Sequence, residues 1–126
     1  MSVEQTQKIL DRYFDAMGRD EDFSAFFADD VTWIMVESEQ EVRGPTVVRD
    51  YLIELHGRMV GGEQRSLVVS DGHAYLEGDT MSAPGPAGQR LFYCLVYDLG
   101  DDRITAVRCY GSLGALMTST RGEQPQ

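Results

Sequence analysis

An unbroken run of apolar and aromatic residues, LFYCLVY, occupies positions 91–97 of the chain. These residue types fit a pleated, half-buried surface, and turn-forming residues follow them at Gly100-Asp101-Asp102. A second β-favouring run begins at Ile104. The pattern predicts an antiparallel hairpin over residues 90–110. A loop of two or four residues centred on Asp101-Asp102 would set Cys94 opposite Cys109.

Alternation of side chains along each strand assigns the two faces of this hairpin. The interior face is expected to carry Phe92, Cys94, Val96, Val107 and Cys109. The outer face is then expected to carry the other apolar and aromatic residues, namely Leu91, Tyr93, Leu95, Tyr97, Ala106 and Tyr110. Such a face is too apolar to be left in water, so the pattern predicts a homodimer formed through it.

Apolar residues at helical spacing predict three helices in the first half of the chain. The first runs from the capping residue Ser2 to Met17, with an apolar stripe made of Ile9, Leu10, Tyr13, Phe14 and Met17. The second is short and covers Asp20–Ala28. The third opens at Gly44-Pro45-Thr46 and ends at Gly61-Gly62, and its apolar face carries Val48, Leu52, Leu55, His56 and Met59.

Further strands are predicted at residues 31–36, 65–70 and 73–82, whereas the charged segment 37–44 has no predicted element. Val31, Trp33 and Met35 share one face of the first of these strands. In the last, Ala74, Leu76, Gly78 and Thr80 are expected to face inward, and His73, Tyr75, Glu77 and Asp79 to face solvent or a partner subunit. Residues 83–88 are expected to form a loop and residues 118–126 a frayed tail.

The order of elements predicts an α+β fold in which a curved, mostly antiparallel sheet carries its helices on one face. The 126 residues, of which 42% are hydrophobic, are expected to form one domain over residues 1–126 with a core at about 5–117. The net charge of −10 argues against nucleic acid and anionic membranes as partners. With no apolar signal core and no membrane-length stretch, the expected location is cytoplasmic.

Few residues in the sequence indicate a specific ligand or reaction. Two cysteines are too few for a disulfide framework, and the sequence has no zinc spacing, phosphate-binding glycine loop or nucleophile elbow, so neither metal nor cofactor is expected. His56 lies on an apolar helix face, where a core histidine is commoner than a base or ligand, although histidine titrates near neutral pH. Tyr13 is an apolar-stripe residue whose hydroxyl needs a partner if it is buried.

Five segments, taken in order, carry a resemblance to a known family: Arg12-Tyr13, the segment FADDVTW at 27–33, Val42-Arg43-Gly44-Pro45, the segment DLGDDRI at 98–104, and Arg108-Cys109-Tyr110. Together they resemble the nuclear transport factor 2-like superfamily, in its SnoaL-like and ketosteroid-isomerase-like branch. The resemblance implies a cone of strongly bent sheet closed by helices around a deep apolar pocket. It also implies homodimers through the outer face of the sheet.

The resemblance does not carry a known mechanism with it. Tyr13 matches the tyrosine of ketosteroid isomerases, but Met35 and Cys94 fall at the two aspartate positions, and neither can replace a carboxyl group in proton transfer. The limonene-type epoxide hydrolases of the superfamily have an acidic and basic triad whose positions here fall at Gly78, Thr80 and Cys109. A shift of one residue would bring Glu77 and Asp79 to the middle strand positions instead.

Two functions are therefore expected as alternatives. One is an acid–base enzyme, of isomerase, cyclase or hydrolase type, acting on a hydrophobic cyclic metabolite with Tyr13 as hydrogen-bond donor, His56 as base, and Glu77 or Asp79 as further candidates. The other is a non-catalytic hydrophobic-ligand-binding or dimeric scaffold protein of the same fold. A nucleophilic Cys94 is disfavoured because a thiol in apolar surroundings is poorly reactive. The pocket is expected to be lined by Tyr13, Met17, Trp33, Met35, Leu55, His56, Met59, Phe92, Cys94 and Cys109.

Overall fold

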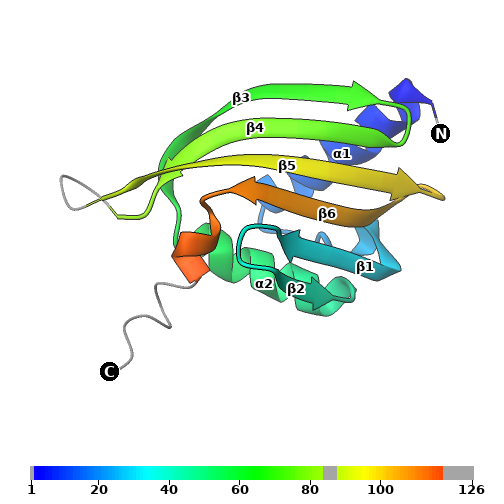
Figure 1. The fold of residues 1–126 in the computed structure, drawn as a ribbon. Coiled ribbons are helices and arrows are strands. Elements are labelled where there is room, and N and C mark those ends of the chain that lie inside the picture. The colour runs from blue at the N-terminus through cyan, green and yellow to red at the C-terminus, as the bar shows by residue number, and fades with distance from the viewer. Residues whose placement is uncertain (1, 84–87, 118–126) are drawn as a thin grey trace.

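A six-stranded curved sheet forms the body of the protein, and a computed structural model describes it for residues 2–83 and 88–117 (Figure 1). The strand order is β2-β1-β6-β5-β4-β3. All neighbouring strands are antiparallel except β1 and β6, which are parallel. In chain order the elements are α1 (Val3–Gly18), η1 (Ser24–Phe26), β1 (Phe27–Met35), β2 (Gln40–Arg43), α2 (Pro45–Gly57), β3 (Val60–Ser70), β4 (His73–Met81), β5 (Arg90–Gly100) and β6 (Arg103–Gly111).

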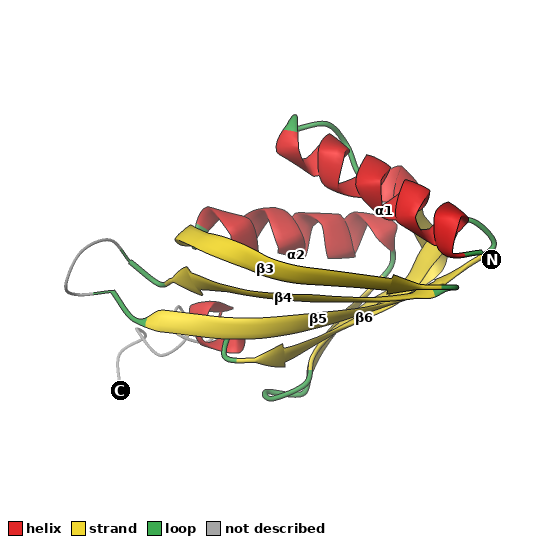
Figure 2. Cartoon of the chain, turned by 90° about the horizontal axis from the view of Figure 1, so that it is seen from above, coloured by secondary structure: helices red, strands yellow, loops and turns green. Residues whose placement is uncertain are grey.

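The two α-helices cover the same face of the sheet (Figure 2). α1 packs beside β3 at one edge, and α2 packs over β1 and β2 at the other. The sheet curves around both helices, and the buried core lies between the layers. The predicted α+β fold, with helices on one face of a curved and mostly antiparallel sheet, is confirmed.

The helices begin and end where local chemistry dictates. Ser2 caps α1 by accepting a hydrogen bond from the backbone N–H of Gln5 at 3.1 Å, and the Gln5 side chain accepts one from the Ser2 N–H at 2.9 Å. Pro45 occupies the first turn of α2, where its missing N–H costs nothing. The buried side chains of the two helices are Thr6, Leu10, Tyr13 and Ala16 on α1 and Val48, Leu52 and Leu55 on α2.

The β5–β6 hairpin closes with the predicted two-residue turn. Asp101 and Asp102 have φ angles of 51° and 62°, as a type I′ turn requires, and Gly100 pairs with Arg103. The register then shifts by one residue, because Leu99 pairs with Ile104 whereas Asp98 pairs with Ala106. This β-bulge leaves Thr105 as the extra residue.

Because of this bulge, the prediction that Cys94 and Cys109 lie opposite each other is wrong. Cys94 pairs with Tyr110 rather than with Cys109, and Cys109 pairs with Leu95. One extra residue sends each later side chain to the opposite face, so Cys94 and Cys109 lie on different faces of the sheet.

The predicted faces of β5 are reversed as a result. Its four residues that face the helices and are buried are Leu91, Tyr93, Leu95 and Tyr97. Phe92, expected inside, is 52% exposed on the outer face. The patch predicted for dimer formation was therefore wrong in all of its β5 members.

Three element predictions also need correction. The helix predicted at Asp20–Ala28 is reduced to the three residues of η1, because Phe27 and the residues after it enter β1. The charged segment 37–44, which had no predicted element, contains β2. Gly61-Gly62, predicted to end the third helix, lies inside β3. A Cβ on Gly62 would meet the Asp79 carbonyl oxygen at 2.2 Å, so a glycine is required at this irregularity in the pairing of β3 with β4.

The remaining predictions for the strands stand as follows. Ala74, Leu76 and Thr80 face inward from β4 and are buried, as expected. The predicted tail at 118–126 and most of the loop at 83–88 lie outside the described residues. In the described parts of the chain, no helix has the length and apolar character needed to cross a membrane.

Candidate functional site

A cavity of about 270 Å³ lies between the helices and the sheet. Both helices contribute residues near their C-terminal ends, and β1, β4 and β5 contribute side chains from their inner faces. The lining consists of Phe14, Met17, Gly18, Trp33, Leu55, His56, Met59, Gln64, Leu76, Tyr93, Leu95, Tyr97 and Leu113. We call this space the interior cavity.

The interior cavity is apolar in depth and polar at its mouth. Its most deeply buried walls are Trp33, Leu55, Leu76, Tyr97 and Leu113. Met17 and Met59 are half-buried, whereas His56 and Gln64 are exposed to solvent. Apolar walls with a few polar groups are the usual composition of a small-molecule site.

One row of the sheet brings the interior cavity close to the outer face. Tyr93 pairs with Gly78 on β4 and with Gly111 on β6, so that neither neighbour has a side chain. A Cβ on Gly78 would lie 2.5 Å from the Tyr93 hydroxyl oxygen and 2.6 Å from the Glu63 carbonyl oxygen. The Tyr93 phenol therefore covers Gly78, an arrangement known to protect strand glycines.

Burial controls the charge state of the groups around the interior cavity. Desolvation lowers the pKa of His56, although part of its side chain remains exposed to solvent. Burial, and after it the charges of Asp79 and Cys109, raise the pKa of Tyr93. Burial also raises the pKa of Tyr97. At neutral pH the cavity therefore presents a neutral imidazole and neutral phenols.

The structure brings together five of the predicted pocket residues in the lining of the interior cavity. They are Met17, Trp33, Leu55, His56 and Met59. Tyr13, Met35 and Cys109 are buried on the same side of the sheet but are not among the lining residues. Tyr13 packs instead within an aromatic cluster with Phe14, Phe23, Phe26, Phe27 and Tyr97, and burial raises its pKa strongly.

Phe92 and Cys94 lie on the other face of the sheet, where they line a second hollow of about 470 Å³. We call it the outer groove. Its lining consists of Arg65, Ser66, Val68, Tyr75, Glu77, Gly78, Phe92, Tyr93, Cys94, Tyr110 and Gly111. The placement of Phe92 and Cys94 in an interior pocket is thus wrong, for the reason of register given above.

The two acidic candidates on β4 also lie away from the interior cavity. Glu77 lines the outer groove. Asp79 is only 4% exposed, because its carboxylate forms ion pairs with Arg65 and, at 3.4 Å, with Arg90. Both residues therefore lie on the outer face of the sheet, away from the space between the helices and the sheet.

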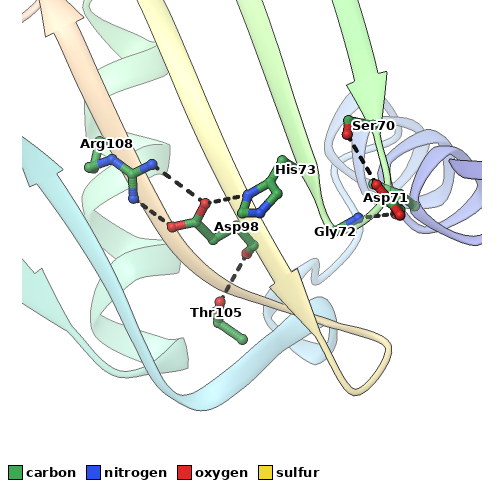
Figure 3. A network of polar contacts seen from close by, with 8 residues as sticks. Ser70, Asp71, Gly72, His73, Asp98, Thr105 and Arg108 are labelled. Atoms are coloured by element: carbon green, nitrogen blue, oxygen red, sulfur yellow. Dashed lines mark hydrogen bonds and ion pairs between the residues drawn. The ribbon is translucent and has the colours of Figure 1, made fainter. Parts of the chain in front are cut away.

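A third carboxylate forms a network of polar contacts at another part of the outer face (Figure 3). Asp98 on β5 accepts a hydrogen bond from Arg108 on β6 and lies 2.9 Å from Nδ1 of His73 on β4. The Asp98 carbonyl oxygen accepts a hydrogen bond from the Thr105 hydroxyl at 3.1 Å, across the bulge. Burial acts to raise the pKa of Asp98, but the hydrogen bonds and charges of Arg108 and His73 outweigh it and lower the pKa.

The sequence-based reasoning missed several residues of the interior cavity. Tyr93, Leu95 and Tyr97 were assigned to the outer face because the bulge was not foreseen. Leu76 was expected to face inward but was not counted as a pocket residue, and Gln64 lies in the part of β3 that was not predicted. In the described residues no group of three or more His, Cys, Asp or Glu side chains could hold a metal ion.

No protein-family profile matches the chain, and no curated protein matches it. Several solved structures, however, match the chain. An NTF2-like protein from Burkholderia xenovorans is 20% identical, with a TM-score of 0.75 over 95% of this chain and 98% of that one. A proposed ketosteroid isomerase from Kribbella flavida is 22% identical, with a TM-score of 0.70 over 86% and 78% of the two chains. A proposed SnoaL-like polyketide cyclase from Jannaschia is 16% identical, with a TM-score of 0.70 over 97% and 94%.

These likenesses define the class of fold. The chain has the nuclear transport factor 2-like fold, as its sequence segments indicated. A protein of designed sequence with a curved sheet matches as well, at 15% identity and a TM-score of 0.73 over 96% of each chain. Because even a designed sequence adopts this architecture, the activity has to be argued from the side chains of this chain.

Proposed function

We propose that the protein binds a small, mostly apolar ring compound in the interior cavity. The observation that carries this proposal is the composition of the cavity, with deeply buried apolar walls from both helices and the sheet and with His56 and Gln64 at its mouth. At about 270 Å³ the cavity is slightly smaller than the roughly 300–1,000 Å³ typical of pockets for drug-sized ligands. One- or two-ring molecules therefore fit it better than four-ring steroids.

A matched pair of variants on one strand tests this proposal. Leu95→Phe adds bulk to the cavity wall, whereas Val96→Phe adds the same ring to the opposite face at the next residue. Binding of a panel of one- and two-ring compounds, measured by calorimetry, is expected to weaken at least tenfold in Leu95→Phe and to stay within twofold of wild type in Val96→Phe. Equal effects of the two variants, or no binding by wild type, would contradict the proposal.

A second candidate function adds acid–base chemistry at the same cavity. Its support is the neutral imidazole of His56 at the mouth, which can accept a proton at neutral pH. Tyr93 and Tyr97 are the tyrosines that could assist it as hydrogen-bond donors, because both line the cavity and Tyr13 does not. In this reading His56→Gln abolishes turnover but leaves ligand affinity within about threefold, whereas loss of both together indicates a binding role only.

We also propose that two copies associate through the outer face of the sheet. The support is a set of large apolar side chains exposed around the outer groove, which are Val68, Tyr75, Phe92 and Tyr110. An apolar and aromatic patch of this kind is unusual on a protein surface that faces only water. Of these residues, Tyr110 is the one that the sequence analysis also assigned to the interface, and the patch lies on the face of the sheet away from the helices, as that analysis expected.

A further inference from the structure

The indole nitrogen of Trp33 is an unsatisfied donor. Among the described residues it is the one buried side-chain nitrogen or oxygen without a hydrogen-bond partner. Trp33 is only 2% exposed, so bulk solvent does not supply the missing acceptor. An indole N–H can only donate, and a buried donor without an acceptor lowers the stability of the fold.

The position of Trp33 connects this donor to the interior cavity. Trp33 lies in β1 between Val42 of β2 and Val107 of β6, whose side chains offer no acceptor. Trp33 is one of the residues that line the cavity, although its Nε1 atom is itself covered by neighbouring atoms. The same lining contains Met17 and Met59, whose unbranched side chains re-pack at low cost, so the wall can adjust and give an occupant access to the indole N–H.

We propose that the occupant of the interior cavity carries an uncharged acceptor oxygen that takes a hydrogen bond from Nε1 of Trp33. This inference rests on the proposed binding function and narrows the class of ligand. The described lining holds no Lys or Arg, and His56 at the mouth has a lowered pKa, so a carboxylate or phosphate would be desolvated without a counter-charge. The favoured compounds are therefore one- or two-ring ketones, lactones or cyclic ethers, rather than acids or pure hydrocarbons.

Nuclear magnetic resonance tests the hydrogen bond directly. Trp33 is the only tryptophan, so its indole N–H gives a single side-chain signal that needs no further assignment. The probes are α-tetralone and tetralin, which share a two-ring frame and differ in the carbonyl group. Saturation with α-tetralone is expected to move the indole proton downfield by at least several tenths of a part per million, and saturation with tetralin to move it much less.

A thermodynamic cycle provides the second test. The ratio of the dissociation constants of tetralin and α-tetralone is measured for wild type and for Trp33→Phe, so that ligand hydration cancels. Loss of one hydrogen bond is expected to reduce this ratio about five- to tenfold. If Trp33→Phe does not fold, replacement of Trp33 by benzothienylalanine keeps the ring system and removes only the N–H.

The outcomes separate this inference from the function on which it rests. If both probes bind and Leu95→Phe weakens them, but the ratio and the indole shift do not distinguish them, the acceptor proposal is wrong and the binding function stands. If neither probe binds wild type at millimolar concentration, the acceptor proposal is wrong for this class of ligand. Whether the binding function fails too is then decided by the wider panel with Leu95→Phe and Val96→Phe.

Discussion

Cys94 lies directly opposite Tyr110 across β5 and β6, and both side chains line the outer groove. Cys109 lies on the other face, where it is nearly fully buried. Burial, followed by the charges of Cys94 and Glu37, raises the pKa of Cys109 to about 12. The two thiols therefore occupy different chemical environments and cannot form a disulfide across the sheet.

Selective alkylation is the first expected consequence. Iodoacetamide at pH 8 is expected to modify Cys94 in the native protein and to reach Cys109 only after denaturation, because Cys109 is buried and its raised pKa keeps the thiol protonated at that pH. Peptide mass spectrometry distinguishes the two sites. Native modification of Cys109 at a rate similar to that of Cys94 would show that the register has been misassigned.

The Tyr93 phenol packs so closely over Gly78 that position 78 has no room for a side chain. Gly78→Ala is expected to lower the free energy of unfolding by about 1–3 kcal/mol, because the added methyl group would collide with the Tyr93 hydroxyl and the Glu63 carbonyl. Gly57→Ala, with no atom within 4 Å of the new Cβ, is the matched control and is expected to be neutral or mildly stabilising. Urea denaturation measures both, and similar effects at the two positions would contradict the argument.

The Asp98 network predicts a pH-dependent contribution to stability. The pKa of Asp98 is lower in the folded state, so its contribution is present above the unfolded-state value of about 4 and is lost as the pH falls through the folded value. Asp98→Asn is expected to cost about 1–2 kcal/mol at pH 7 and progressively less below pH 4.

The control for this experiment is Asp71→Asn. Asp71 is exposed, and its carboxylate accepts a 3.3 Å hydrogen bond from the adjacent Ser70 hydroxyl without a cationic partner (Figure 3). Its effect on urea denaturation is expected to be below about 0.5 kcal/mol at either pH. A pH-independent cost of Asp98→Asn would show that its charge is not responsible.

Association through the outer face can be tested with two equally exposed apolar residues. Phe92 on β5 is 52% exposed and Ile53 on α2 is 56% exposed. Sedimentation at micromolar concentration is expected to show a dimer for wild type and Ile53→Glu, and the 14.1 kDa monomer for Phe92→Glu. Clean monomers of wild type would eliminate the dimer, and dissociation by Ile53→Glu alone would move the interface to α2.

The sequence was sufficient for the architecture but not for the faces of the last hairpin. Turn chemistry at Asp101-Asp102 indicated a loop of two or four residues, and the structure has the two-residue turn with the first pairs after it in the expected register. The bulge at Thr105 has no comparable signal, since threonine favours regular strands and its hydroxyl bond to the Asp98 carbonyl forms only after the strands pair. One residue of shift was enough to place Phe92 and Cys94, predicted inside, on the outer face, and to bury the β5 residues that had been predicted for the dimer surface.

Tertiary contacts explain the other missed elements. Phe23, Phe26 and Phe27 have helical spacing in the sequence, but in the structure they surround the ring of Tyr13, and this packing draws Phe27 into a strand. Half of the residues of β2 are charged, and the strand lies at the edge of the sheet. Its sequence therefore shows neither the alternation of polar and apolar residues nor the apolar run that predicts a strand. The helix-borne candidates for the interior cavity were easier to predict, because Met17, Leu55 and His56 follow from helical periodicity alone.

Tyr93 lines both the interior cavity and the outer groove, and its two cross-strand neighbours are Gly78 and Gly111. At this row the space under the helices and the surface where a second copy is proposed to bind are separated by the thickness of the sheet, and neither glycine adds a side chain to either face. A ligand that displaces the Tyr93 ring over Gly78 is therefore expected to shift this row of the sheet and so to change the outer face. Ligand affinity would then depend on protein concentration, which calorimetry at several concentrations would reveal.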